Sequence, residues 1–141
     1  MTTGASGVTV SQDCIDKFQD LKLKKKHAYI LFTLNKDKTE IIVDKTSSST
    51  KYEEFTNDLP EAECRWAVYN FEFDKGAGGH RNKIVFIAWS PEDAKMKERT
   101  LFASSKDVLR RSLSGIGVEI QGNDFSEVAY ESVFDKASRG A

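Results

Sequence analysis

The side chains that most often carry chemistry are few in this chain. It holds two histidines, His27 and His80, and two cysteines, Cys14 and Cys64. Neither histidine stands at metal-ligand spacing from the other or from a cysteine, so the spacing does not favour a metal site. A Cys64–His80 catalytic pair would need a third group to orient the imidazole, and none is recognisable. We therefore expect no catalysis, no cofactor and no metal.

Two further classes of ligand are disfavoured. Residues 74–81 contain three glycines, but no Gly-Lys-Ser/Thr follows them and no helix opens there, so they do not form a phosphate-binding loop. The aromatic residues of segment 65–73 alternate as core positions would, and they lack the Lys/Arg-Gly-aromatic signature of an RNA-binding sheet. We expect no nucleic-acid partner.

The most informative chemistry is a set of cations on one predicted helix. On a helical wheel, Lys95, Arg99, Lys106 and Arg110 cluster within about 60° of one another and form a basic ridge. Cations on a helix surface are commonly no more than solvated side chains. Here, however, only Glu92 at the beginning of the ridge could relieve the repulsion, and such like charge indicates an acidic partner outside the chain.

The helix that carries the ridge has clear start and stop signals. Ser90 is a capping residue, Pro91 suits the first helical position, and Gly115 closes the helix after about Leu113. Ser104 and Ser105 can bend its axis by bonding back to the preceding turn. Its apolar residues fall in one arc of roughly 140° that predicts a core-facing stripe: Leu101, Phe102, Val108, Leu109 and Leu113.

The remaining segments predict an α/β fold in one domain. We expect a flexible N-terminal tail at residues 1–10 and a domain at residues 11–139, with further helices at 11–23, 51–58 and 125–137. Runs rich in branched and aromatic residues predict strands at 27–34, 39–43, 65–73, 82–89 and 118–120. Together they predict a five-stranded mixed β-sheet sandwiched by helices.

Composition agrees with a small globular protein. The chain has 141 residues, 39% of them hydrophobic and 30% charged, with a formal net charge of −1, which argues against disorder and against bulk polyanion binding. The first residues lack the features of a secretory signal, and no segment is long and apolar enough to span a membrane. Two cysteines are too few for the disulfide framework of a small secreted domain, so we expect buried free thiols in a cytosolic protein.

Several strings resemble the cofilin (actin-depolymerising factor) family, in order and over residues 6–139. They are DLKLKKKHAYILF at 20–32, YEEF at 52–55, LPEAECRWAVYNFEF at 59–73, NKIVFIAWSP at 82–91, FASSKDVLRRSL at 102–113 and GNDFSEV at 122–128. The resemblance implies a single actin-depolymerising-factor homology domain whose long helix binds actin. It implies a non-enzymatic protein that binds monomeric and filamentous actin and severs and depolymerises filaments.

The resemblance also implies two actin-binding surfaces. The surface shared by monomers and filaments would comprise Ser6, Gly7, Val8, Lys97, Arg99, Lys106, Asp107, Arg110 and Arg111. The filament-binding surface would comprise Arg81, Lys83, Asp135, Lys136 and Arg139. Lys97 and Arg111 lie off the basic ridge on the wheel, so the implied surface is broader than the ridge.

Regulation is implied by the same resemblance. Ser6 would be a phosphorylation switch, and the helix cations could hold phosphoinositide headgroups in competition with actin. We expect a monomer that prefers ADP-bound actin. We expect it in the cytoplasm and on the cytoskeleton, and the sequence leaves entry into the nucleus undecided. The alternative is a filament-side-binding or phosphoinositide-regulated adaptor of the same fold that does not sever filaments.

The sequence departs from the family pattern at three places. Thr100 stands where methionine is usual, Lys95-Met96 where a small residue and proline are common, and Asn70 where aspartate is common. Thr100 removes an apolar contact, so we expect somewhat weaker binding to actin and no change of partner. Thr100 is also the residue that keeps the adaptor alternative open.

Overall fold

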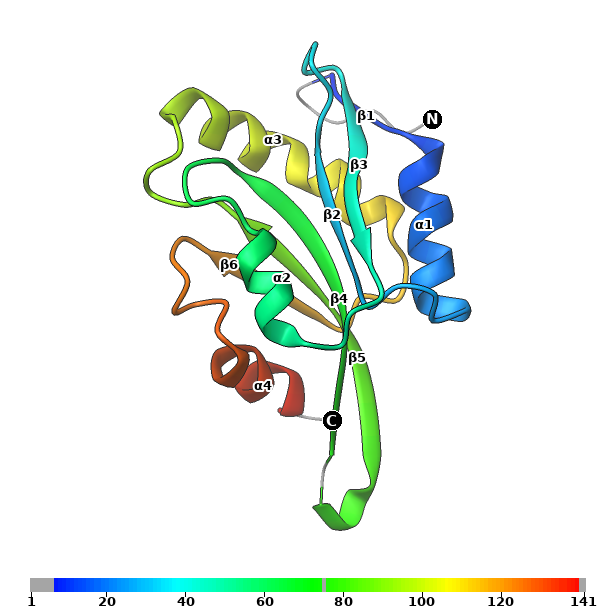
Figure 1. Cartoon of the computed structure of the whole chain (residues 1–141). Helices are drawn as coiled ribbons and strands as arrows, with labels where there is room; N and C mark the ends of the chain where they lie inside the picture. The colour runs from blue at the N-terminus through cyan, green and yellow to red at the C-terminus, as the bar shows by residue number, and fades with distance from the viewer. Residues whose placement is uncertain (1–6, 75, 140–141) are drawn as a thin grey trace.

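The structure is a computed structural model that describes residues 7–74 and 76–139. A mixed sheet of six strands runs through the middle of these residues in the order β1-β3-β2-β4-β5-β6 (Figure 1). The strands are β1 (Thr9–Val10), β2 (Tyr29–Leu34), β3 (Glu40–Ser47), β4 (Arg65–Asp74), β5 (His80–Trp89) and β6 (Val118–Gly122). The two outer strands pair parallel to their neighbours and the other pairs are antiparallel.

In the described residues, four α-helices cover the two faces of the sheet. They are α1 (Gln12–Leu23), α2 (Tyr52–Asp58), α3 (Met96–Ser112) and α4 (Tyr130–Ser138), and a short 3-10 turn, η1 (Gly76–Gly78), lies in the β4–β5 hairpin. Helices α1 and α3 pack on one face, whereas α2 and α4 pack on the other. The central strands are therefore buried on both faces, which explains their nearly continuous apolar runs.

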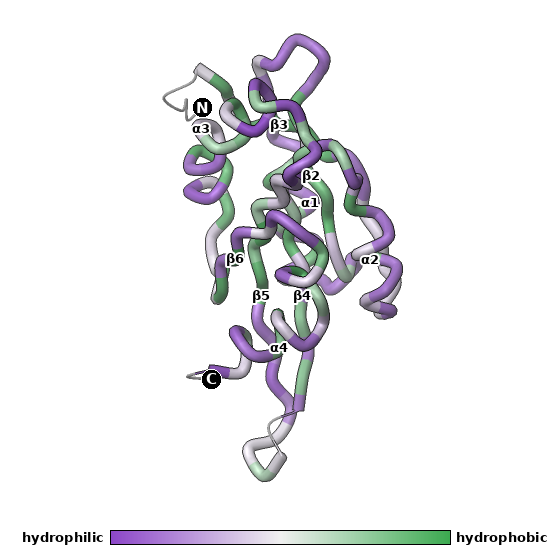
Figure 2. The backbone as a smooth tube through the Cα atoms, turned by 90° about the vertical axis from the view of Figure 1, so that its left-hand side faces the viewer, coloured by the Kyte–Doolittle hydropathy of each residue, from purple (hydrophilic) through white to green (hydrophobic). Residues whose placement is uncertain are grey.

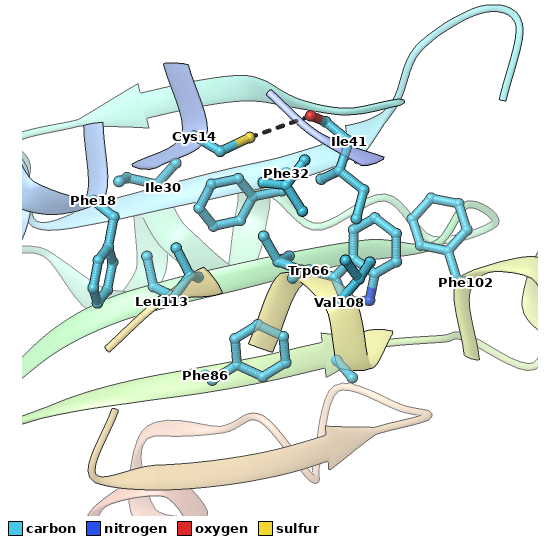
Figure 3. Packing of buried hydrophobic residues seen from close by; sticks show 14 of the residues in the cluster. Cys14, Phe18, Ile30, Phe32, Ile41, Trp66, Phe86, Phe102, Val108 and Leu113 are labelled. Carbon is cyan, nitrogen blue, oxygen red and sulfur yellow. Dashed lines mark hydrogen bonds between the residues drawn. The ribbon is translucent and has the colours of Figure 1, made fainter. Parts of the chain in front are cut away.

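Each face of the sheet has its own hydrophobic core. On the α1 and α3 side, Phe18, Trp66 and Phe102 belong to one buried cluster, and the Trp66 and Phe102 rings lie 4.2 Å apart between centroids (Figure 3). On the other side, Phe55 and Tyr69 belong to a second cluster, with 5.1 Å between their ring centroids. The strand aromatics are thus core residues, as their alternation predicted.

Burial falls away toward the β4–β5 hairpin. Strand β5 is exposed over its first residues and buried from Ile84 onward, so it changes from hydrophilic to hydrophobic along its length (Figure 2). The hairpin thus projects from the covered part of the sheet (Figure 1). Its polar side chains are available to a partner.

The α/β fold predicted from the sequence is confirmed, but the sheet has six strands and not five. The additional strand is β1, in which Thr9 and Val10 pair parallel with Glu40 and Ile41 of β3. Val8 is only 1% exposed, so residues 8–10 do not belong to the flexible tail that we expected over residues 1–10. Val8 and Val10 belong to the same buried cluster as the apolar residues of α1 and α3.

The predicted start of the long helix was wrong. Ser90 does not cap it, because its backbone N–H donates to the Gly122 carbonyl at 2.8 Å and its hydroxyl accepts from Arg99 Nε at 3.2 Å. Pro91 instead begins a turn closed by a 3.0 Å hydrogen bond from Ala94 N. The helix begins at Met96, after Lys95 in an extended conformation.

The predicted start of the last helix was also wrong. Residues 124–129 form consecutive turns, in which the Asp124 carboxylate accepts from Glu127 N at 3.1 Å and Val128 N donates to the Phe125 carbonyl at 3.3 Å. Ala129 is extended, so α4 begins only at Tyr130. The first helix, in contrast, is confirmed, because the Ser11 side chain accepts from Cys14 N and caps α1.

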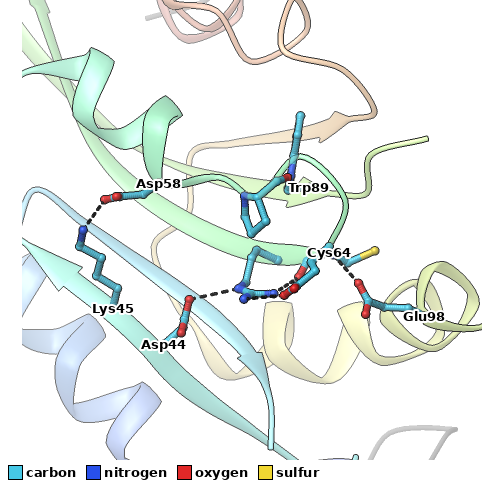
Figure 4. A network of polar contacts seen from close by, with 9 residues as sticks. Asp44, Lys45, Asp58, Cys64, Trp89 and Glu98 are labelled. Carbon is cyan, nitrogen blue, oxygen red and sulfur yellow. Dashed lines mark hydrogen bonds and ion pairs between the residues drawn. The ribbon is translucent and has the colours of Figure 1, made fainter. Parts of the chain in front are cut away.

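A polar network ties β3, α2, β4 and α3 together around the start of β4 (Figure 4). Lys45 Nζ lies 2.8 Å from Asp58, and Arg65 Nε lies 3.1 Å from Asp44. The backbone N–H of Cys64 donates to Glu98 of α3 at 2.5 Å. This last bond fixes the N-terminal half of α3 against the sheet.

Both cysteines are free and buried, as predicted. Cys14 Sγ lies 3.4 Å from the Ile41 carbonyl (Figure 3), and burial raises the pKa of its thiol to about 11. Burial also raises the pKa of Cys64. Since the thiolate is the reactive form, neither sulfur is set up as a nucleophile.

Candidate functional site: the basic surface of α3

Helix α3 presents its cations from a rigid support. Phe102, Val108 and Leu109 are buried against the sheet, and Leu113, the residue that follows the helix, is buried in the same core. The predicted core stripe is therefore confirmed, with Leu101 partly buried beside it. Ser105, which was not in the stripe, is fully buried too. A helix fixed along one side can hold the charges on its other side in constant positions.

Three of the four ridge cations have partners within the fold. Lys106 Nζ lies 2.9 Å and Arg110 Nε 3.0 Å from the two carboxylate oxygens of Glu119, which belongs to β6. Arg99 Nε donates to the Ser90 hydroxyl. The expectation that the ridge is unpaired was therefore wrong. Acids on the same helix were the only partners considered for these cations, whereas Glu119 lies on strand β6.

Glu119 orders the middle of the ridge. The hydrogen bond from Lys106, followed by the charge of Lys106 and the contacts of Arg110, lowers the pKa of the Glu119 carboxyl. One carboxylate thus pairs with two cations that lie about one helical turn apart. Because it carries a single negative charge, one of the two positive charges remains uncompensated. The ridge is still a basic surface, although a weaker one than the helical wheel indicates.

Other members of the predicted shared surface extend the site. Arg111 Nε pairs with Asp107 at 3.2 Å one turn earlier on α3, and Lys97 is exposed near the start of the helix. Strand β1 lies against α3, so Val8 belongs to the same side of the molecule, and Gly7 precedes it with a φ of 83°. Ser6 lies outside the described residues.

A small hollow lies beside the ridge. Its volume is about 90 Å³, and its lining includes Ser90, Arg99, Lys106, Gln121 and Arg65. Two of the ridge cations therefore border it, together with a hydroxyl and an amide that can donate hydrogen bonds. Groups of these kinds are suited to an anionic oxygen cluster.

The predicted filament-binding residues gather at the opposite end of the molecule. Lys83 Nζ of β5 donates to the carbonyl of Arg139 at 3.2 Å, and Arg139 pairs with Asp135 at 2.6 Å. Arg81 is exposed two residues before Lys83 on the same strand, and Lys136 is exposed on α4. The hairpin and α4 thus form a second charged surface, well separated from α3 (Figure 1).

Other kinds of site find no support in the part of the chain that the structure describes. Within residues 7–74 and 76–139, no three His, Cys, Asp or Glu residues are grouped so that they could hold a metal ion. Over the same residues, no helix has the length and apolar character needed to cross a membrane.

Comparison with known proteins decides the family. The model of the cofilin/tropomyosin-type actin-binding proteins matches residues 7–138. The chain belongs to this family. A cofilin from Mycosarcoma maydis is 59% identical over 135 residues, which cover 96% of this chain and 97% of that protein. A cofilin from Schizosaccharomyces pombe is 52% identical over 134 residues, covering 95% and 97% of the two chains.

Solved structures agree with the cofilin fold. The crystal structure of Streptomyces griseoflavus cofilin has a TM-score of 0.90 and 58% identity, covering 96% of this chain and all of that one. Plasmodium berghei actin depolymerization factor 2 has a TM-score of 0.83 at 30% identity, with 97% and 99% coverage. The cofilin resemblance of the sequence motifs is thereby confirmed.

Glu119 and Ser90 are the residues of this surface that the sequence analysis missed. Glu119 stands between two apolar residues in a short strand, so its alternation predicted only that it faces away from the core. Its contact with α3 depends on the parallel pairing of β6 with β5, in which Ile120 lies opposite Ile87. Nothing in the local sequence specifies that pairing.

Proposed function

We propose that this protein binds actin monomers and filaments through the basic surface of α3 and the neighbouring residues 7–10. We propose further that it binds filaments through the hairpin and α4, and that it severs and depolymerises them. The observation that carries the proposal is the fixed row of Arg99, Lys106 and Arg110 on a helix anchored to the sheet. Actin is proposed as the partner because the chain belongs to a family of actin-binding proteins.

The mechanism needs no chemical step. A ligand shifts a conformational equilibrium only by the difference between its affinities for the two states. If α3 enters between adjacent actin subunits and the hairpin contacts the next subunit, binding favours a twisted, ADP-bound form of the filament. Contacts between subunits then weaken where decorated and bare segments meet, and the filament breaks there.

The α3 surface is tested by neutralising its cations. Arg99→Gln, Lys106→Gln and Arg110→Gln together should weaken binding to actin monomers by about 10- to 100-fold, because oppositely charged contacts are lost. Binding is measured with fluorescently labelled monomers, and circular dichroism establishes that the variant is folded. The matched control replaces three exposed lysines elsewhere, Lys24, Lys26 and Lys51, by glutamine. Equal affinities of the two triple variants would contradict the proposal.

The filament surface is tested separately. Arg81→Gln with Lys83→Gln should leave monomer affinity within about twofold, because these side chains lie at the far end of the molecule from α3. The same variant should lose most of its effect on filament length in single-filament imaging. A variant that still severs at the wild-type rate would refute the assignment. A wild-type protein that decorates filaments without shortening them would favour the adaptor alternative.

Ser6 is proposed as the regulatory switch. A phosphate would add about −1.5 to −2 charges next to Gly7 and Val8, which lie on the same side as α3, and would repel an acidic actin surface. Ser6→Asp should therefore weaken monomer binding by about tenfold relative to Ser6→Ala. Equal affinity of the two variants would remove this role.

Phosphoinositide binding is a second candidate, favoured by the hollow between Ser90, Arg99 and Lys106. A headgroup phosphate there would occupy cations that the proposal assigns to actin. Vesicles that carry phosphatidylinositol bisphosphate should then displace labelled actin monomers, whereas vesicles with the same charge density of phosphatidylserine should not. Displacement by both kinds of vesicle would indicate charge attraction alone.

A further inference from the structure

Arg99 differs from the other cations of the basic ridge in how its side chain is held. Lys106 and Arg110 share the carboxylate of Glu119. In the part of the chain that the structure describes, no acid lies within ion-pair distance of Arg99. Lys95 also lacks an acid there, but no hydrogen bond fixes its exposed side chain. Arg99 thus combines a fixed side chain with a charge that no acid compensates.

Ser90 is the residue that fixes the Arg99 side chain. Arg99 Nε donates to the Ser90 hydroxyl at 3.2 Å, and Cys64 Sγ donates to the same oxygen at 3.7 Å. A hydroxyl oxygen has two lone pairs, so it can accept both bonds. Ser90 is itself fixed, since its backbone N–H donates to the Gly122 carbonyl at 2.8 Å. The acceptor for Arg99 is therefore in place before any partner binds.

Glu98 ties the same turn of α3 to the sheet. Its carboxylate accepts a hydrogen bond from the backbone N–H of Cys64 at 2.5 Å (Figure 4). Cys64 precedes β4 and Ser90 follows β5, at the end where these two strands pair, so both contacts of the helix reach one end of the sheet. Lys95, at the N-cap position, provides no side-chain hydrogen bond. The first turn of α3 is thus held by the sheet and not by a capping side chain.

The bond at Nε determines which edge of the Arg99 guanidinium group can face a partner. This group is planar and carries five N–H donors in a rigid fork. Because Nε is engaged with Ser90, the edge that Nε shares with one terminal nitrogen is partly occupied. Among the described residues, Nη1 and Nη2 have no hydrogen-bond partner. Their two parallel N–H bonds therefore remain for a carboxylate, which they match as a bidentate pair.

We propose that Ser90 is a positioning residue for actin binding, which holds Arg99 so that Nη1 and Nη2 form a bidentate contact with one carboxylate of actin. This inference rests on the proposed function and specifies one of its contacts. Without the Ser90 hydroxyl, Arg99 would keep its charge, but its long side chain would have to be ordered at the moment of binding, which lowers affinity. Ser90 acts through Arg99 and needs no contact of its own with actin.

The first test is a titration of fluorescently labelled actin monomers with full-length variants. Ser90→Ala should raise the Kd by about three- to tenfold, the effect of ordering one long side chain. Ser90→Thr keeps the hydroxyl and should stay within about twofold of wild type. Ser132→Ala is the matched control, because it removes a serine hydroxyl from α4 on the other face of the sheet. Unchanged affinity of Ser90→Ala would overturn the role of Ser90 alone, whereas a wild-type protein that does not bind monomers would refute the proposed function and this contact with it.

A double-mutant cycle separates positioning from a general structural effect. In an Arg99→Met background, Ser90→Ala should change the Kd by less than about 1.5-fold, because no guanidinium group is left to position. The same loss in both backgrounds would refute the proposal. Nuclear magnetic resonance supplies an independent readout, since the Arg99 Nε–H proton should exchange with water faster in Ser90→Ala than in wild type. Equal exchange rates would also contradict the proposal.

Arg99→Lys tests the bidentate contact. Lysine keeps the positive charge but cannot donate two parallel N–H bonds from a planar fork, so this variant should bind monomers about tenfold more weakly than wild type. Wild-type affinity of Arg99→Lys would overturn the bidentate contact, because charge alone would then be sufficient.

Discussion

Glu119 illustrates how a single residue modifies a surface that several others define. Its carboxylate contacts Lys106 and Arg110, so the acid that balances the ridge lies 13 and 9 residues away along the chain. The pair is partly exposed, and exposed ion pairs contribute little to stability. Its main effect is to hold two flexible cationic side chains in a defined arrangement that a partner can recognise.

Removing this carboxylate should have a measurable pH signature. The folded-state pKa of Glu119 is lowered from its usual value of 4.5, so its contribution to stability is present above that value and is lost as the pH falls through the folded-state pKa. Glu119→Gln should lower the free energy of unfolding by about 0.5 kcal/mol at pH 7, a value reduced for solvent screening. The difference from wild type should shrink as the pH falls below 4.5.

Urea unfolding at pH 3 and pH 7 measures this difference. Glu92→Gln is the matched control, because Glu92 is exposed and has no ion pair within the described ranges 7–74 and 76–139. It should change stability equally little at pH 3 and pH 7. An effect of Glu119→Gln that is the same at both pH values would show that the ion pairs do not cause it.

The β4–β5 hairpin contains a titratable contact between its two strands. His80 Nδ1 lies 3.0 Å from Asp74, and Nε2 lies 3.5 Å from Glu72, so the imidazole bridges two carboxylates of the opposite strand. The hydrogen bond with Asp74, and then that with Glu72, raises the pKa of His80 above 6.5. Lys83 and Arg81 of the proposed filament surface lie on the same hairpin.

Protonated His80 should therefore tighten the hairpin. Because its folded-state pKa is raised, the stabilisation is complete below pH 6.5 and is lost as the pH rises through the folded-state pKa. Hydrogen-exchange protection of the amides of residues 72–74 and 80–83, corrected for the intrinsic exchange rate, should fall as the pH rises above 6.5. His80→Gln should abolish this pH dependence, while amides of β2 serve as the internal reference. Equal pH dependence in His80→Gln would show that another group is responsible.

At the scale of the whole molecule, the sheet separates two cores that serve different purposes. The core on the α1 and α3 side supports the proposed actin surface, whereas the core on the other side packs α2 and α4 against the sheet. Both cores share the same strands. Stability should thus be common to the two sides, while binding to actin should depend on one of them.

Two large-to-small substitutions separate these effects. Phe55→Ala and Phe102→Ala remove buried rings from opposite cores, and each should lower the free energy of unfolding by about 3–5 kcal/mol. Folded Phe55→Ala should bind actin monomers within about twofold of wild type. Phe102→Ala should bind more weakly, because α3 loses its ring contact with Trp66. Urea unfolding and monomer titration measure the two quantities, and an equal loss of affinity in both variants would contradict the separation.

The sequence by itself determined the parts of this protein that local patterns encode. The sequence predicted a helix at residues 11–23, where α1 lies, and the branched and aromatic runs predicted β2, β4 and β5. The wheel placed Phe102, Val108 and Leu109 on the buried side of α3. Ordered family motifs identified a cofilin-like chain. These features could be predicted because they depend on residues that are close together in the sequence.

The tertiary structure alone decided how distant residues meet. Only there does Glu119 pair with cations of α3, and only there does the Ser90 hydroxyl accept a hydrogen bond from Arg99. The structure also shows that α3 begins at Met96 and not at Pro91. It also joined Lys83 of β5 to Arg139 beyond α4. The physical reason is that strand order and register fix these contacts, and both follow from packing over the whole sheet, which no local pattern specifies.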